Sequence, residues 1–592
     1  MKEFFKYTLA TITGIIVTSL IGFLLLIMVI GAIVASTEKT VIVEDQSMLS
    51  IKLDNLIVDR APNDPFADLN IPGFWATRKV GLDNILSSIE KAKDDDRIRC
   101  IYLDLSITNG GMAAVEEIRN ALLAFRDSSD KPVYAYGDIM DQKAYYLATA
   151  ADKIVLNPQG TIDFRGLGGE YTFFKNALEK LGVEMQIVRH GKFKAAVEPY
   201  MLEKMSDENR EQTMTYLTSL WNQMLKGISE QRDIPVEKLN ALADDVLTFR
   251  KADVALEAGL VDDLKYKDEV LDDLREITGI AAGKGIPVVG VTSYAKAPVK
   301  KGKKSTFSRN KIAVIYASGE IGMPLSASEG ISGDKLSREI RKVRQDSSYK
   351  AIVLRVDSPG GSAFDSEVIW REVKLAAEQK VVVASMGNLA ASGGYYIVCA
   401  ADKIVAQPNT ITGSIGVFGT IPNAGELLNK KLGITTDVVK TNKNSDMPSL
   451  TRKMTSFERD LMQQHVEDIY DVFLERVADG RGLTKEAVDE IGQGRVWSGE
   501  NALAIGLVDE LGGLEKAVKM AAEMAGLENY RTVNLPALAD PFQELLKGGS
   551  DNVRARILKG TLGESSRYYE LVRTAGNMNG VYARLPYDID IK

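Results

Sequence analysis

Residues 137–155 read GDIMDQKAYYLATAADKIV, and residues 387–405 read GNLAASGGYYIVCAADKIV. The two stretches align without a gap and share a Tyr-Tyr pair and the closing segment AADKIV. Two further pairs of segments match in the same order along the chain, namely 101–111 with 352–361 and 255–264 with 502–511. Three matches in one order, about 250 residues apart, indicate an internal duplication.

Each copy alternates short apolar strands with helices. In the second copy we predict strands at 351–356, 381–385 and 404–406 from their Val, Ile and Leu content. Helices are predicted at 366–379, from the spacing of the apolar residues, and at 391–400. Strand–helix–strand alternation is typical of βαβ units, so the sequence predicts an α/β fold for each copy.

Length and composition restrict the functions open to the chain. A chain of 592 residues is too long for one hydrophobic core and should form several domains. The net charge of −8 argues against a broad nucleic-acid-binding face. With two cysteines and two histidines, the chain has no disulfide framework and no metal-ligand cluster, so we expect no metal and no cofactor.

The N-terminal segment is predicted to anchor the chain in a membrane. Residues 7–37 carry no charge and are rich in Ile, Leu, Val and Phe, and about 20 apolar residues suffice to cross a bilayer. The alternative is a cleaved signal peptide, whose apolar region is usually shorter. Lys2 and Lys6 precede the segment and acidic residues follow it. This asymmetry predicts a single-pass helix with a cytoplasmic N-terminus and the rest of the chain outside the cytoplasm.

These features predict five parts of the chain. They are an anchor with a short flank (1–40), a first repeat (41–295), a basic linker (296–311), a second repeat (312–540) and a C-terminal tail (541–592) without an assigned role.

The two repeats differ at a serine. The segment 390–394 of the second repeat, AASGG, lies opposite MDQKA of the first, so that Ser392 faces Gln142. Small neighbours let a substrate backbone approach this hydroxyl, and free N–H groups at a helix start favour an oxyanion. Serine is also a preferred helix N-cap, and the local sequence alone favours that simpler interpretation.

The first repeat offers a base. Lys192 matches Lys443 of the second repeat, whereas Lys194 lies opposite Ser445. Each repeat therefore has one unmatched polar group, as expected if a catalytic pair were divided between them. Burial can lower the pKa of a lysine far enough for the neutral amine to act as a base. The alternative is that Lys194 is an ordinary surface residue, as an unmatched lysine more often is. His190, close to Lys194 in the sequence, could instead serve as the base in a Ser-His pair.

Two further elements could complete such a site. Ser414 lies in the glycine-broken segment TITGSIGVFG (410–419) and could orient the lysine, or be an ordinary turn serine. The pair Gly360-Gly361 could present N–H groups to an oxyanion, although Gly110-Gly111 repeats it in the first copy and indicates a partly structural turn.

Four motifs together resemble the bacterial signal peptide peptidase family in its long, two-repeat form: DSPGGS (357–362), MGNLAASGGYY (386–396), TGSIGVFG (412–419) and GKFKAAVEP (191–199). The resemblance covers nearly the whole chain, including the anchor. It implies two crotonase/Clp-protease-like ββα repeats, with Ser392 as nucleophile, Lys194 as base and Ser414 steadying the lysine. It further implies oxyanion contacts from Gly393 and Gly361.

The resemblance also implies a setting for the enzyme. The family forms a homotetramer on the bacterial inner membrane and degrades residual signal peptides and other short apolar peptides on the periplasmic side. Two other functions remain open, an acyl-CoA-processing crotonase-like enzyme and a non-catalytic membrane scaffold.

Overall fold

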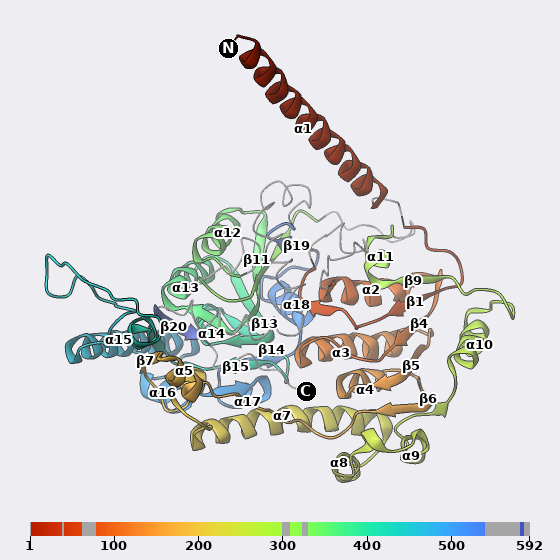
Figure 1. Cartoon of the computed structure of the whole chain (residues 1–592). Coiled ribbons are helices and arrows are strands. Elements are labelled where there is room, and N and C mark those ends of the chain that lie inside the picture. Colours follow the sequence, from red (N-terminus) through yellow and green to blue (C-terminus); the bar gives the residue numbers. More distant parts are fainter. Residues whose placement is uncertain are drawn as a thin grey trace.

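The computed structural model describes residues 2–37, 41–61, 78–298, 308–322, 330–538 and 580–584. Helix α1 (Lys2–Thr37) projects from the body of the molecule (Figure 1). A search of the described residues finds no helix that is both long and apolar enough for a membrane crossing. The predicted anchor therefore stays a prediction. Most of the predicted linker (residues 299–307) and most of the predicted tail lie outside the described residues.

Both repeats are built on a parallel sheet with the same strand order. In the first repeat the order across the sheet is β8 (Asp263–Leu264), β6 (Lys153–Ile162), β5 (Val133–Met140), β4 (Ile98–Asp104), β1 (Ser47–Ile51), β9 (Val288–Gly290). In the second repeat the corresponding order is β18 (Glu510–Leu511), β14 (Lys403–Ala406), β13 (Val381–Ala391), β11 (Tyr349–Ser358), β10 (Lys311–Ser318), β19 (Arg531–Leu535). The shared order supports the duplication and the predicted α/β fold.

A short extension of the second sheet reaches the segments that carry the candidate site. Strand β15 (Ile411–Gly413) pairs in parallel with the end of β13, and β17 (Val496–Ser498) pairs antiparallel with β15. Strand β15 pairs with residues 389–391 of β13, after the residues 383–386 that pair with β14.

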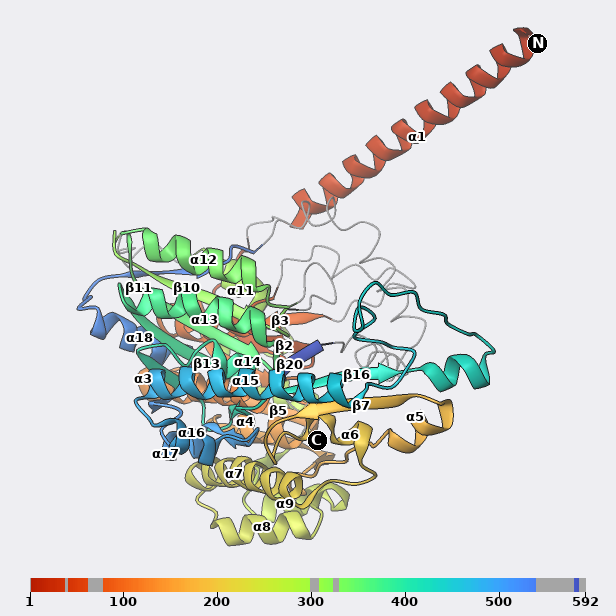
Figure 2. The same ribbon diagram turned by 90° about the vertical axis from the view of Figure 1, so that its left-hand side faces the viewer.

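Helices cover the sheets (Figures 1 and 2). Those of the first repeat are α2 (Leu82–Asp94), α3 (Met112–Ser128), α4 (Gln142–Ala148), α5 (Lys175–Leu181), α6 (Glu198–Met201), α7 (Asp207–Arg232), α8 (Val236–Asp244), α9 (Ala252–Glu257), α10 (Lys267–Thr278) and α11 (Val291–Lys296). Those of the second are α12 (Gly333–Gln345), α13 (Ala363–Ala377), α14 (Gly393–Tyr396), α15 (Ser456–Arg481), α16 (Lys485–Ile491), α17 (Gly499–Ala504) and α18 (Leu514–Met524).

The helix predicted at 391–400 is wrong in its bounds. Strand β13 continues to Ala391, and α14 spans only Gly393–Tyr396. Ser392 separates them with φ 57° and ψ −116°, a backbone conformation that neither a strand nor a helix contains. The sequence pattern could not predict this turn because a serine rarely adopts a positive φ.

A four-stranded antiparallel sheet joins the repeats. Its order is β12 (Gly360–Ser362), β20 (Gly580–Arg584), β16 (Phe418–Asn423) and β7 (Glu184–Arg189). Strand β7 belongs to the first repeat and β16 to the second, and they pair over six residue positions from Phe418↔Arg189 to Asn423↔Glu184. The chain that follows β7 is thereby held against the second repeat.

A buried ion-pair cluster also connects the repeats. The side chain of Arg355, on β11, is 1% exposed and lies 3.0 Å from Asp59 and 2.7 Å from Glu117, which are both in the first repeat. Charges this deeply buried persist only when they are paired, so the cluster fixes how the two repeats meet.

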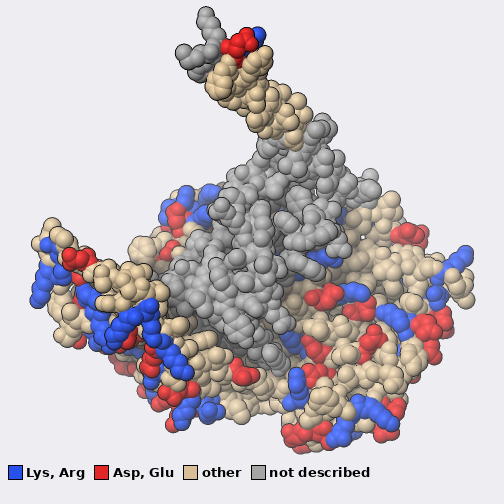
Figure 3. Space-filling view, viewed as in Figure 1, with Lys and Arg blue, Asp and Glu red and all other residues tan. Residues whose placement is uncertain are grey.

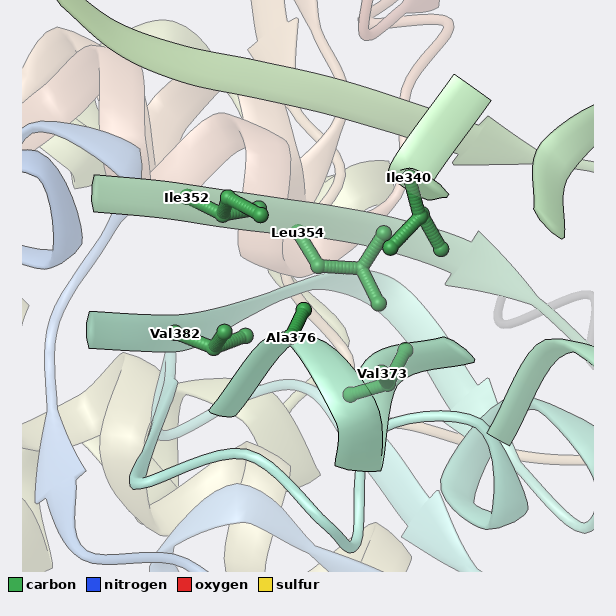
Figure 4. Close-up of a pocket in the computed structure, with 6 residues that line it drawn as sticks. All are labelled: Ile340, Ile352, Leu354, Val373, Ala376 and Val382. Carbon is green, nitrogen blue, oxygen red and sulfur yellow. The ribbon is translucent and has the colours of Figure 1, made fainter. Parts of the chain in front are cut away.

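The hydrophobic core is closely packed. Figure 4 shows a small apolar gap in the second repeat, where side chains from α12, α13, β11 and β13 point toward one another. Its lining is Ile340, Ile352, Leu354, Val373, Ala376 and Val382, without a polar group. Cys100 and Cys399 are buried free thiols. The gap is a packing defect of the core with no chemistry of its own.

Candidate active site

Ser392 stands in a strained turn at the end of β13. Its φ of 57° places it in a region that serine avoids, and its N–H donates to the carbonyl of Gly413 at 2.8 Å. The side chain makes no N-cap hydrogen bond to α14. The hydroxyl is therefore not used as a helix cap, the interpretation that the local sequence favoured.

Lys194 reaches the serine from the other repeat. It follows β7, whose pairing with β16 directs the chain to the second repeat. Gly494, with φ 83°, lies against it so closely that a Cβ atom there would be 2.6 Å from the Lys194 backbone. Only a glycine lets the lysine backbone approach this segment.

The lysine amine has three oxygen neighbours. Its Nζ atom lies 2.9 Å from Ser392 Oγ, 3.0 Å from Ser414 Oγ and 3.2 Å from the Ser414 carbonyl oxygen. A neutral amine has two N–H donors and one lone pair. The two donors match the oxygens of Ser414, and the lone pair can accept the proton of the Ser392 hydroxyl.

Burial decides the charge of this amine. Lys194 is 0% exposed, and desolvation lowers its pKa well below the ordinary value of a lysine. Burial is the only cause of this shift within the described residues, because no carboxylate there acts to raise the pKa. The site therefore favours the neutral form, which can take up a proton.

Ser414 is fixed by its backbone as well as by the lysine. Its φ is 50°, and its N–H donates to the carbonyl of Arg495 at 2.6 Å. All three side chains of the cluster, Ser392, Lys194 and Ser414, are fully buried. The structure thus brings together, within one chain, the three residues named from the sequence.

The two glycines named as oxyanion donors belong to α14 and to the strand that packs against it. Gly393 begins α14, directly after Ser392, and α14 packs against β12, which contains Gly361. Gly361 has φ 154°, and a Cβ atom there would lie 2.1 Å from the carbonyl oxygen of Ile321. The position requires glycine for space, and its oxyanion role stays a prediction.

The first repeat has different side chains at the aligned positions. Gln142, which faces Ser392 in the alignment, accepts hydrogen bonds from the N–H groups of Arg165 and Gly166 at 2.9 and 2.8 Å. Ser445, which faces Lys194, lies in an exposed loop. The glutamine side chain closes the loop of its own repeat, at the place where the second repeat keeps a hydroxyl.

Two site features were not predicted from the sequence. Gly494 supports Lys194, and Gln212, on α7, bonds to the carbonyl of Phe193 at 3.0 Å. The duplication contained a signal for Gly494, because it faces Leu247 when the segments ALEAGLVDDL and ALAIGLVDEL are aligned. Gln212 has no comparable signal, since its contacts depend on how the repeats pack.

The Ser-His alternative does not fit the geometry. The His190 ring stacks on Tyr470 with ring centroids 4.1 Å apart, and the nitrogen beside Ser392 belongs to Lys194. Among the described residues, no group of three or more His, Cys, Asp or Glu side chains could hold a metal ion.

Comparisons with known proteins identify the family of the chain. The model of peptidase family S49 matches residues 125–281 and 374–528, one segment in each repeat. The chain is 35% identical to Protease 4 of Haemophilus influenzae over 517 residues, which cover 85% of this chain and 83% of that protein. It is 34% identical to the chloroplastic serine protease SPPA of Arabidopsis thaliana, over 82% of this chain and 72% of that protein.

Solved structures give a weaker match. A ClpP1 variant from Listeria monocytogenes covers 35% of this chain and 94% of its own, with 16% identity and a TM-score of 0.24. The match to a membrane-bound stomatin-specific protease covers 39% of this chain and 99% of that protein's chain, with 16% identity and a TM-score of 0.26. These scores do not establish a common fold, and the family assignment depends on the sequence matches. With a family model matched in both repeats and long relatives matched over most of their length, the chain belongs to peptidase family S49 and is a serine peptidase.

Proposed function

We propose that this serine peptidase works through a Ser392–Lys194 dyad and cleaves short apolar peptides, including residual signal peptides, at a membrane. The observation that carries the proposal is the 2.9 Å separation of Lys194 Nζ and Ser392 Oγ in a fully buried setting. A buried neutral amine at hydrogen-bond distance from a hydroxyl is the arrangement that general-base activation of a serine requires.

The reaction follows from these positions. Lys194 Nζ takes the Ser392 proton as Oγ attacks the peptide carbonyl. The resulting oxyanion accepts hydrogen bonds from the N–H groups of Gly393 and Gly361. The lysine ammonium then protonates the departing amine, and the acyl group remains bonded to Ser392 Oγ as an ester. The neutral lysine then takes a proton from water, whose oxygen attacks the ester carbonyl. The ammonium returns that proton to Ser392 Oγ as the acyl group leaves.

Strand β20 supports a peptide as the substrate. It pairs antiparallel with β12 through Gly361↔Ala583 and with β16 through Phe418↔Tyr582. The Phe418 ring centroid, on β16, lies 6.0 Å from Lys194 Nζ, and β12 packs against α14, which begins directly after Ser392. The edges of these two strands thus pair with an extended segment of the chain. Proteins that bind peptides by adding them as a strand to a sheet also bind them in this extended conformation.

Membrane attachment is part of the proposal. Residues 7–37 carry no charge, and on the part of α1 that Figure 3 colours, charged atoms lie only near the free end. On the described part of the face in Figure 3, basic and acidic side chains are interspersed. We propose an inner-membrane anchor with the repeats on the periplasmic side, where released signal peptides partition, and a homotetramer as the assembly.

The test is the substitution Ser392→Ala. It should abolish hydrolysis of a leucine-rich fluorogenic peptide without changing the thermal unfolding midpoint, since a methyl side chain fits wherever a buried hydroxymethyl group does. Unchanged hydrolysis would contradict the proposal. Hydrolysis of acyl-CoA thioesters without peptide cleavage would favour the crotonase-like alternative. A folded protein with neither activity would favour the scaffold.

A further inference from the structure

Helix α7 belongs to the first repeat but also contacts the second. It runs beneath both repeats in Figure 1 and packs against β17. Near its middle, the hydroxyls of Ser219 and Ser498 lie 2.7 Å apart and share a hydrogen bond. The helix is therefore placed to set the position of one repeat relative to the other beside the dyad.

One side chain of α7 bonds to both repeats. Gln212 is 0% exposed, and its Nε2 donates to the Phe193 carbonyl at 3.0 Å and to Asn209 Oδ1 at 3.1 Å. Its Oε1 accepts the N–H of Val496 at 3.1 Å. The amide thus joins the backbone of the first repeat to that of the second, with both polar atoms satisfied.

The two backbone positions that it joins lie next to segments that contact Lys194 and Ser414. Phe193 directly precedes Lys194 in the chain. Val496 directly follows Arg495, whose carbonyl accepts the N–H of Ser414 at 2.6 Å. A displacement at either end would move the lysine amine or its hydroxyl partner.

Further backbone bonds tie three segments into one layer. The N–H of Phe193 donates to the Gln493 carbonyl at 3.0 Å, and the N–H of Gly494 donates to the Ile415 carbonyl at 2.6 Å. The segment around Gly494 therefore lies between the lysine segment and the Ser414 segment. From α7, the Gln212 side chain bonds to two of these segments, at Phe193 and at Val496.

We infer that Gln212 is a positioning residue for the dyad: it holds the lysine segment of the first repeat against the Arg495–Val496 segment of the second and so sets the distance from Lys194 Nζ to Ser392 Oγ. The inference rests on the proposed dyad. Gln212 touches no reacting atom, and its effect on the reaction passes through Phe193 and Val496.

The experiment compares Gln212→Met with Gln223→Met in the full chain. Methionine matches glutamine in length but cannot make either backbone bond. Gln223 lies on the same helix and bonds to Glu116 at 3.0 Å instead of to the dyad segments. Active sites are titrated with a fluorophosphonate, so that kcat is expressed for each reactive serine. KM and kcat are measured separately with a leucine-rich fluorogenic peptide.

We expect Gln212→Met to lower kcat for each titrated site by about 10- to 100-fold, because a small displacement of a catalytic group is costly, with KM nearly unchanged. Gln223→Met should keep kcat within about twofold, since its bonds do not reach the dyad. Gln212→Glu keeps the acceptor for Val496 but loses the donor to Phe193, so its kcat should lie between those of Gln212→Met and the unmodified protein.

An unchanged kcat for each titrated site in Gln212→Met would overturn the inference, even if its thermal stability were lower. An equal loss in Gln223→Met would also overturn it, because removing a glutamine hydrogen bond elsewhere on α7 would then have the same effect. If Gln212→Met does not fold, the kcat of Gln212→Glu decides, and a value equal to that of the unmodified protein refutes the role. Activity in Ser392→Ala would instead refute the proposed function, so the two failures are distinguishable.

Discussion

Replacing Gly494 by alanine should inactivate the enzyme by displacing Lys194, the proposed base. A Cβ atom at this position would lie 2.6 Å from the N, Cα and Cβ atoms of Lys194, whereas ordinary contacts begin near 3.4 Å. The Lys194 backbone therefore has to move by most of an ångström. A displacement of about 1 Å at a catalytic group costs on the order of 100-fold in rate, and we expect a loss of kcat of that size.

A second glycine provides a matched control. Gly506 has φ 79°, close to the 83° of Gly494, and a Cβ atom there would meet nothing within 4 Å. Both substitutions carry the conformational penalty of about 1–2 kcal/mol for an alanine in the left-handed region. Only Gly494→Ala also moves the lysine.

The assay measures kcat with a leucine-rich fluorogenic peptide and the thermal unfolding midpoint of each variant. We expect a small decrease in the midpoint for Gly506→Ala and a larger one for Gly494→Ala, whose Cβ atom also meets the Lys194 backbone, with kcat lost only in Gly494→Ala. Equal kcat values in the two variants would refute the reasoning, because the lysine would then not need the position that Gly494 gives it.

Three further predictions follow from the same contacts. Ser414→Ala removes one hydrogen bond to Lys194 and should lower kcat/KM by about tenfold, since such a bond contributes about 1 kcal/mol or somewhat more; an unchanged value would exclude an orienting role. Arg355→Met leaves the buried carboxylates of Asp59 and Glu117 unpaired and should lower the free energy of unfolding by about 3–5 kcal/mol in urea denaturation; a loss below 1 kcal/mol would mean that the cluster does not hold the repeats together. Deleting residues 580–592 removes β20 from its place between β12 and β16 and should lower KM for added peptides; a higher KM would show that β20 builds the peptide site instead of occupying it.

The sequence predicted most of the fold because the two copies could be compared. The repeated segments correspond to equivalent strands, β5 with β13 and β4 with β11, and the order of the strands agrees between the two sheets. Periodicity did not predict the bend at Ser392, because a strained serine follows no propensity. Nor did it predict that β7 would pair with β16, since pairing between the repeats is decided by packing.

The site was predicted by contrast between the copies. Ser392 and Lys194 were the polar groups without a counterpart, and both lie in the cluster that the structure forms. The same contrast, applied to the segment before residue 502, would have found Gly494. Gln212 could not be found in this way, because its bonds to Phe193 and Val496 exist only after the repeats pack together.

In the proposed mechanism, a neutral lysine from the first repeat activates a serine of the second. The most direct test is the rate at which a fluorophosphonate labels Ser392 as a function of pH, in the unmodified protein and in Lys194→Met. Burial lowers the pKa of Lys194, and the amine is neutral above that pKa. The labelling rate should therefore rise as the pH increases through the lowered pKa and then level off, and Lys194→Met should label very slowly at every pH. Labelling of Lys194→Met at the rate of the unmodified protein, or labelling of a different serine, would contradict the account.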